Sequence, residues 1–195
     1  MKARRVKGLD PEGELADNAE RIVLTRLDEL HSFMPRAADP AQVEALHDMR
    51  IAAKRLRYVL EITGPCFGPY TDKAVEFVRE LQDLLGEIHD CDVQRPDVAA
   101  FADELSDADV VAVGSRAAGA DDLDPRLLAR APHRADYAGL AALEVFLRAR
   151  RELLFARFLE AWEDAGRKGF RARLEYAVTE RSRARPPQVS SLPSS

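Results

Sequence analysis

The sequence predicts an all-α fold, an antiparallel helical bundle of about five to six helices. Apolar residues recur at helical spacing, no run of alternating β-branched residues competes with that pattern, and only 10 glycines and 11 prolines interrupt it. Hydrophobic residues make up 46% and charged residues 32% of the 195, a composition typical of an ordered, soluble chain. This length argues against both a disulfide miniprotein and a large multidomain enzyme.

Six segments carry the helical pattern. Two of them begin at an Asp-Pro pair, Asp10-Pro11 and Asp39-Pro40, in which the aspartate acts as an N-cap and the proline takes the first helical position. Gly64-Pro65 and Gly68-Pro69 end the second helix, because neither glycine nor proline readily continues a helix. The expected helices cover residues 12–34, 41–63, 71–89, 97–105, 137–164 and 166–182.

The remaining segments are expected to lie outside the helices. Residues 106–135 are rich in Asp, Ala and Gly and are expected to form a long acidic loop. Residues 1–11 form a basic N-terminal segment, and residues 12–182 form one helical domain. Residues 183–195, rich in proline and serine, are expected to be a disordered tail.

Charge and composition narrow the classes of function. The formal charge of -5 argues against a protein that coats nucleic acid with its whole surface. Cys66 and Cys91 are too few for a disulfide framework and lack the spacing of a zinc site, which indicates reduced thiols and a cytoplasmic location. The basic N-terminus is not followed by an apolar stretch, so we expect no export signal. No apolar run approaches the roughly 20 residues that cross a bilayer.

The helix expected at 41–63 has two chemically different faces. Its apolar side chains fall in one arc, and the opposite side carries a basic stripe at spacings of three, four and three residues: His47, Arg50, Lys54 and Arg57. Like charges at these spacings repel one another, so the basic stripe indicates an anionic partner. Its length of about 15 Å suits an extended phosphate chain better than one small phosphate.

A simpler interpretation of the basic stripe is a solvated helix face with local ion pairs. Glu61 shares the stripe, and Glu44 and Asp48 lie near it on the helix. The sequence leaves both interpretations open.

Three further features place charge where the core does not explain it. His89-Asp90 either ends a helix, with the acid capping the next segment, or uses Asp90 to hold a basic side chain in place. Arg79, on the polar edge of its helix, would extend the basic surface. Arg151 lies within an apolar stripe, so it either pairs with an acid, Asp90 being one candidate, or faces an aqueous groove.

Two strings carry a resemblance to a known family. Residues 47–58 have the pattern H-x-x-R-x-x-x-K-R-x-R-Y, and residues 81–90 read L-Q-D-L-L-G-x-x-H-D. On these strings the chain resembles the CHAD family, the conserved histidine α-helical domain, over about residues 12–164. That family usually contains two related halves. Only one H-x-x-R helix is present here, and the chain resembles the second half.

The resemblance implies a helical bundle that binds inorganic polyphosphate through basic side chains, often in proteins associated with polyphosphate granules. No catalytic domain accompanies it, so we expect a non-catalytic protein without a cofactor or metal. The groove is either open or completed by a second copy of the chain, and we predict a homodimer. By position, the resemblance implies ligand contacts from His47, Arg50, Lys54, Arg57, Arg55, Arg79 and Arg151, support from His89 and Asp90, and a packing role for Tyr58.

Two other functions are alternatives to polyphosphate binding. A metal-dependent phosphohydrolase could use His47, His89, Asp90 and Asp136 as ligands, although the bases of the stripe would repel a metal bound at His47. Nucleic acid could bind the basic segment 165–185, but that segment lacks interleaved aromatic residues that stack on bases.

Overall fold

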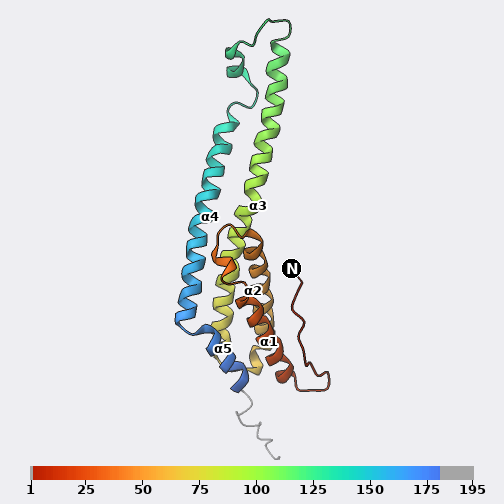
Figure 1. The fold of residues 1–195 in the computed structure, drawn as a ribbon, viewed down its shortest axis with the longest axis vertical. Coiled ribbons are helices and arrows are strands. Elements are labelled where there is room, and N and C mark those ends of the chain that lie inside the picture. The colour runs from red at the N-terminus through yellow and green to blue at the C-terminus, as the bar shows by residue number, and fades with distance from the viewer. Residues whose placement is uncertain (1, 181–195) are drawn as a thin grey trace, which may run out of the picture. The chain divides into compact units, whose positions relative to one another are not determined.

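The computed structural model describes residues 2–180, which form five α-helices and no strand (Figure 1). The predicted all-α class is therefore confirmed. None of the described helices is long and apolar enough to span a membrane. The helices are α1 (Leu15–His31), α2 (Val43–Thr63), α3 (Tyr70–Arg116), α4 (Asp136–Arg167) and α5 (Phe170–Thr179), with short 3-10 helices at Arg36–Ala38, Gly64–Cys66 and Pro125–Arg130.

The described residues divide into two compact units. Unit 1 comprises residues 2–83 and 159–180, and unit 2 comprises residues 84–158. Helices α3 and α4 each begin in one unit and end in the other. The predicted domain at 12–182 spans both units.

Unit 1 holds the larger share of the fully buried side chains. Helix α1 packs against α2 and α5, and the first part of α3 adds its own apolar face. Fully burying a leucine or methionine stabilises the fold by about 1.5–3 kcal/mol, so this face fixes the orientation of α2. The apolar side predicted for this helix is buried in α2, with Val59 only half-buried; the buried residues are Ala45, Leu46, Met49, Ala52, Ala53, Leu56, Leu60 and Thr63.

Unit 2 consists of the second part of α3, the first part of α4 and the segment between them. Near the end of α3, the buried carboxylate of Asp109 accepts hydrogen bonds from the Tyr137 hydroxyl at 2.8 Å and the His133 backbone N–H at 3.2 Å, and pairs with His133 Nδ1 at 2.9 Å. Burial raises the pKa of Asp109, but these hydrogen bonds outweigh it and hold the pKa below its ordinary value. Asp109 therefore ties the start of α4 to α3.

The predicted end of the third helix is wrong. Helix α3 continues past residue 89, through the predicted short helix at 97–105 and into the predicted acidic loop at 106–135, with Pro96 in its interior. An internal proline costs a helix about 3 kcal/mol, but contacts with the following chain support this half of α3, including Arg95 Nη2 to Glu144 Oε1 at 2.8 Å. Only residues 117–135 separate α3 from α4.

The predicted N-caps are also wrong. Helices α1 and α2 begin a few residues after the Asp-Pro pairs, with Glu14 and Gln42 at the N-cap positions. Asp10 Oδ1 accepts from Glu12 N at 3.1 Å and Asp39 Oδ1 from Ala41 N at 2.9 Å. Each aspartate thus closes a turn in front of its helix, a common alternative for this side chain.

The C-terminal boundaries differ as well. Helix α4 extends beyond the predicted residue 164 to Arg167, and α5 covers Phe170–Thr179 of the predicted 166–182. The predicted disordered tail at 183–195 lies outside the described residues. Cys66 and Cys91 are free thiols, half-buried and buried respectively, as predicted.

Candidate functional site

The basic stripe lies on α2, opposite the buried face of that helix. Lys54 is exposed, and the other three members are half-buried, so all four are anchored at the boundary between core and solvent. The buried residues between them, such as Met49 and Leu56, prevent α2 from rotating the stripe inward. The helical period and the core thus hold the four side chains along one line.

Arg50 and Arg57 are members of the stripe whose hydrogen bonding is incomplete at Nε, and Arg50 is the one for which no ion pair within the described residues compensates there. Its Nε is covered by neighbouring atoms and has no hydrogen-bond partner within residues 2–180. Leaving a buried donor unpaired costs about 1–3 kcal/mol, and more when the group is charged. An anionic ligand would bring the acceptor oxygens that this guanidinium lacks.

Arg57 and Arg79 share one carboxylate. Glu61 Oε1 lies 3.6 Å from Arg57 Nε on the same helix and 3.1 Å from Arg79 Nη2 on α3. The structure therefore places Arg79 beside the end of the stripe. It also confirms the local ion pair expected from Glu61, but two bases share a single acid and one positive charge remains uncompensated within this group.

Tyr58 lies outside the core. Its side chain is 44% exposed, with Lys54 Nζ 5.7 Å and Arg57 Cζ 4.9 Å from the ring centroid. Cation–π contacts at exposed sites contribute about 0.5–1 kcal/mol each. Tyr58 therefore packs against two bases of the stripe, Lys54 and Arg57, and not in the core.

Arg55 contacts a buried acid instead of joining the stripe. Glu29 of α1 is 1% exposed, and its carboxylate accepts from Arg55 Nη1 at 3.0 Å, from Arg26 Nη1 at 2.5 Å and from the Arg4 backbone N–H at 3.2 Å. A buried carboxylate must be neutralised in this way, so Arg55 has a structural partner across the α1–α2 contact. Glu29 thereby also fixes the basic N-terminal segment, through the Arg4 backbone N–H. Arg26 adds a second contact to that segment, since its Nη2 donates to the Arg4 carbonyl at 3.0 Å.

The remaining predicted site residues lie in unit 2. His89 is half-buried and Asp90 is exposed, and both lie in the interior of α3, so the interpretation of His89-Asp90 as a helix end is wrong. Arg151 is buried and forms an ion pair with Asp92, to which its Nη2 donates at 3.3 Å. Of the two alternatives left open for Arg151, the acidic partner is the one present, but it is Asp92 and not the candidate Asp90. Two residues turn a helix by about 200°, so Asp90 and Asp92 face opposite ways.

One site feature was not expected from the sequence. Gln82 of α3 has a buried side-chain oxygen without a hydrogen-bond partner in the described chain, although it belongs to the string L-Q-D-L-L-G. Its amide oxygen is a further incomplete polar group in unit 1, besides those of the stripe. Within residues 2–180, no three His, Cys, Asp or Glu side chains are grouped to hold a metal ion.

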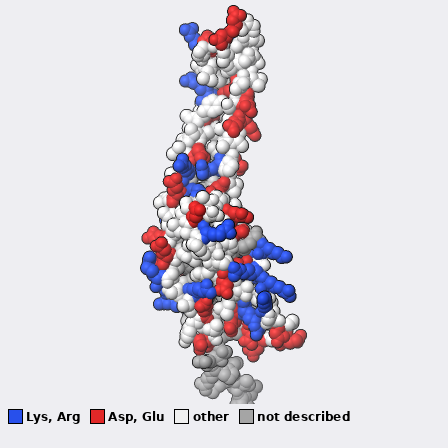
Figure 2. Space-filling model, in the orientation of Figure 1, with Lys and Arg blue, Asp and Glu red and all other residues white. Residues whose placement is uncertain are grey.

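The basic N-terminal segment adds to the positive charge of unit 1. It carries Lys2, Arg4, Arg5 and Lys7 without an acid among residues 2–7. Figure 2 shows Lys and Arg side chains gathered at the lower right of the view, where Figure 1 draws this segment. Through Arg4 and Glu29 the segment is fixed to α1.

Comparison with known proteins gives one match. No curated protein and no solved structure matches the chain significantly. A family model described as the CHAD domain matches residues 2–99, just over half of the chain. The matched segment starts and ends earlier than the resemblance at 12–164, and it includes the basic stripe, Arg79 and His89-Asp90 but not Arg151. The chain belongs to the CHAD domain family.

Proposed function

We propose that this chain binds inorganic polyphosphate without catalysing a reaction on it. The contacts come from the basic stripe of α2, with Arg79 extending it. Membership of a family linked to polyphosphate supports the class of ligand. Association with polyphosphate granules and a homodimer that completes the groove belong to the same proposal.

The incomplete pairing of Arg50 is the observation that carries this proposal. Its buried, unpaired Nε lies in a row with the exposed Lys54 and with Arg57, which shares the carboxylate of Glu61 with Arg79. A row of bases with so few internal acids gains stability from a linear anion, since each phosphate supplies acceptors to the next base along the helix.

The test is calorimetric titration of the full chain with long-chain polyphosphate at several salt concentrations. Binding that neutralises phosphates releases counterions, so the logarithm of the affinity should fall linearly with the logarithm of the salt concentration. In the variant Arg50→Ala/Lys54→Ala the affinity should fall and the salt slope should become shallower by about two, which is about one for each lost phosphate contact.

A matched control removes two exposed bases elsewhere. Arg148→Ala/Arg167→Ala changes the net charge equally, and both side chains are exposed on α4 with only local acidic partners. We expect this variant to retain the wild-type affinity and slope. Equal losses in both variants would mean that net charge, not the stripe, determines binding, and salt-independent binding would contradict the proposal outright.

A further inference from the structure

Contacts at three places hold the basic N-terminal segment along α1. The first contact is at Arg4, whose backbone N–H donates to Glu29 Oε1 at 3.2 Å and whose carbonyl accepts from Arg26 Nη2 at 3.0 Å. Glu29 and Arg26 both belong to the second half of α1. This contact uses only the backbone of Arg4, and the side chain of Arg4 is exposed.

The other two contacts lie further along the segment and nearer to the start of α1. A Cβ added to Gly8 would lie 3.8 Å from Arg21 Nε, so Gly8 lies against the side chain of Arg21. The backbone of Asp10 exchanges two hydrogen bonds with the Asn18 side chain, of 2.8 and 2.6 Å. The residue numbers rise along the segment while they fall along α1. The basic N-terminal segment therefore runs antiparallel to α1 (Figure 1).

The side chains of this segment carry charge of one sign. Lys2, Arg4, Arg5 and Lys7 are all exposed, and residues 2–9 contain no Asp or Glu. The three contacts with α1 involve the backbone of the segment, so none of them occupies one of these four side chains. The segment thus presents four bases to solvent from a fixed backbone.

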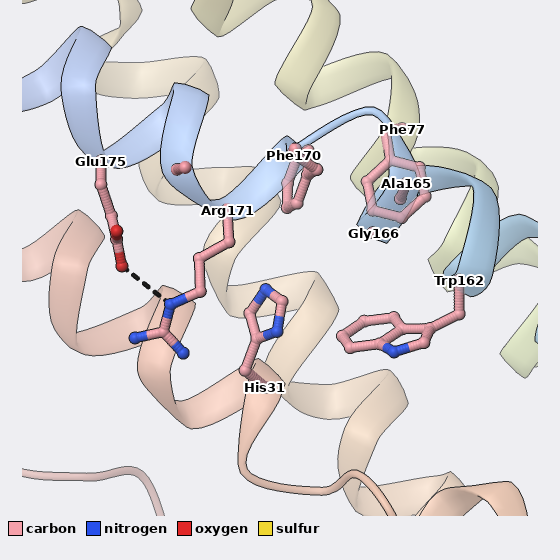
Figure 3. Close-up of a pocket in the computed structure, with 10 residues that line it drawn as sticks. His31, Phe77, Trp162, Ala165, Gly166, Phe170, Arg171 and Glu175 are labelled. Carbon is pink, nitrogen blue, oxygen red and sulfur yellow. Dashed lines mark hydrogen bonds and ion pairs between the residues drawn. The ribbon is translucent and has the colours of Figure 1, made fainter.

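The two acids near the end of α1 are paired with other bases. Glu29 accepts from Arg26 and Arg55 as well as from the segment, so two guanidinium groups share its single carboxylate. Asp28 pairs with Arg171 of α5, whose place in unit 1 Figure 3 shows. The acid that holds the segment therefore does not neutralise its four exposed bases.

The segment meets α2 on the flank next to the basic stripe. The Arg4 N–H and Arg55 Nη1 donate to the same atom, Glu29 Oε1. Arg55 directly follows Lys54 of the stripe, so the two side chains leave α2 about 100° apart, or about 10 Å around a helix about 10–12 Å across. Bases therefore lie on both sides of the outer face of α2, those of the stripe on one side and Arg55 with the segment on the other.

We infer that the basic N-terminal segment is a second row of contacts for the polyphosphate chain, through Lys2, Arg4, Arg5 and Lys7. The inference rests on the proposed function and extends its site from one helix face to two rows of bases. Lysine and arginine side chains both donate charge-assisted hydrogen bonds to phosphate oxygens. A polyphosphate chain that crosses the outer face of α2 contacts both rows.

The contacts with α1 make this second row effective. Fixing the backbone of a free chain costs about 1–2 kcal/mol per residue, and a free basic tail would lose that free energy on binding. The backbone of the segment is already held by α1, so its bases bind phosphate at a smaller cost in entropy. The segment also belongs to the matched part of the chain, since the family match covers residues 2–99.

The test is calorimetric titration with long-chain polyphosphate at several salt concentrations. Lys2→Gln/Arg5→Gln/Lys7→Gln removes three bases of the segment and keeps its backbone contacts with α1. We expect the affinity to fall at least about tenfold at about 0.1 M salt, because three phosphate contacts and their released counterions are lost. The salt slope should become shallower by about three, which is about one for each lost base.

The matched control is Arg126→Gln/Arg130→Gln/Arg148→Gln, which removes the same charge from exposed side chains of unit 2. This variant should retain the wild-type affinity and slope. Equal losses in the two triple variants would overturn the inference, because net charge would then determine binding. An unchanged salt slope in the segment variant would also overturn it.

A second measurement needs no variant. Trypsin cuts after Lys and Arg, and the segment lies outside the helices, so limited digestion of the wild type shortens the chain at its N-terminus. Long-chain polyphosphate should slow this cleavage several-fold and leave the rate of cleavage after Arg134, between α3 and α4, unchanged. Mass spectrometry of the products measures both rates. Equal protection at both places, or none in the segment, would overturn the inference.

The proposed function and this inference fail in different ways. A wild-type chain that does not bind polyphosphate removes both of them. Binding that weakens in Arg50→Ala/Lys54→Ala but is unchanged in the segment variant keeps the basic stripe as the site and removes only the second row.

Discussion

His31 links the stability of unit 1 to pH. Burial first, and the positive charge of Arg171 second, lower the pKa of His31 below its ordinary value of 6.5, against the opposing influence of Glu175 and Asp28. The unfolded chain therefore binds a proton on this side chain more readily than the folded chain. The contribution of neutral His31 is complete above about pH 6.5 and is lost as the pH falls below it.

We predict that the free energy of unfolding decreases more steeply between about pH 7 and pH 5.5 in the wild type than in His31→Phe, by up to about 1 kcal/mol per pH unit. Urea unfolding followed by circular dichroism at several pH values measures both slopes. The other histidines and the carboxylates are common to both proteins, so they cancel in the difference. Parallel slopes would show that His31 does not titrate on unfolding.

Individual site residues differ in how well the sequence predicted them. The stripe on α2 follows from periodicity, because the same arithmetic that buries Met49 turns Arg50 away from the core. Periodicity does not predict which acid each arginine pairs with. Glu29, which is buried and captures Arg55, and Asp92, which captures Arg151, come from contacts between helices that spacing along one helix cannot reveal.

The turn between α4 and α5 depends on a glycine conformation. Gly169 has a φ of 70°, in the left-handed region, and precedes the first residue of α5, whereas Gly166 lies in the last turn of α4. In the left-handed conformation alanine is less stable than glycine by about 1 kcal/mol or more. Within a helix alanine is more stable than glycine by up to about 1 kcal/mol. Two glycines three residues apart should therefore respond oppositely to the same substitution.

We predict that Gly169→Ala lowers the free energy of unfolding by about 1 kcal/mol, and that Gly166→Ala leaves it unchanged or raises it by a few tenths of a kcal/mol. Gly166→Ala is the matched control, because its added Cβ meets no described atom within 4 Å. Chemical denaturation of the two variants and the wild type gives both values. A stable Gly169→Ala variant would mean that the turn adopts another conformation.

The helices themselves were predicted where local and tertiary preferences agree. The end of α2 lies where the Gly-Pro pairs predict it: the last helical residue is Thr63, directly before Gly64. The predicted loop at 106–135 was wrong in its first part, which belongs to α3 although its acidic, alanine-containing sequence is typical of a loop. Contacts of Arg95 and Asp109 with the following chain stabilise this part of the helix. Those contacts join residues 24 or more positions apart, beyond the reach of any local pattern.

The two units of the molecule differ in how completely they bury their apolar side chains. Unit 1 has five helical segments to cover its core, whereas unit 2 has the two long helices and their connection. On α4, Phe146 is 59% and Leu153 is 63% exposed. They lie seven residues apart, so they occupy the same face of the helix, and a face of this kind is typical of contacts between helices.

We predict that a second copy of the chain covers this face, giving the homodimer that the single stripe was expected to need. The mass from light scattering should rise from one chain to two as the concentration increases. In Phe146→Ser/Leu153→Ser the transition should move to at least about tenfold higher concentration, since each removed side chain withdraws buried apolar area from the interface.

The matched control for this prediction is Leu15→Ser/Ile62→Ser, which removes two exposed apolar side chains of unit 1 that are 70% and 78% exposed. It should dimerise as the wild type does, because these side chains lie on different helices and form no continuous stripe. A mass of one chain at every concentration would remove the dimer. Equal weakening in both variants would place the contact on another surface, and a polyphosphate site built from two copies would then lose its structural basis.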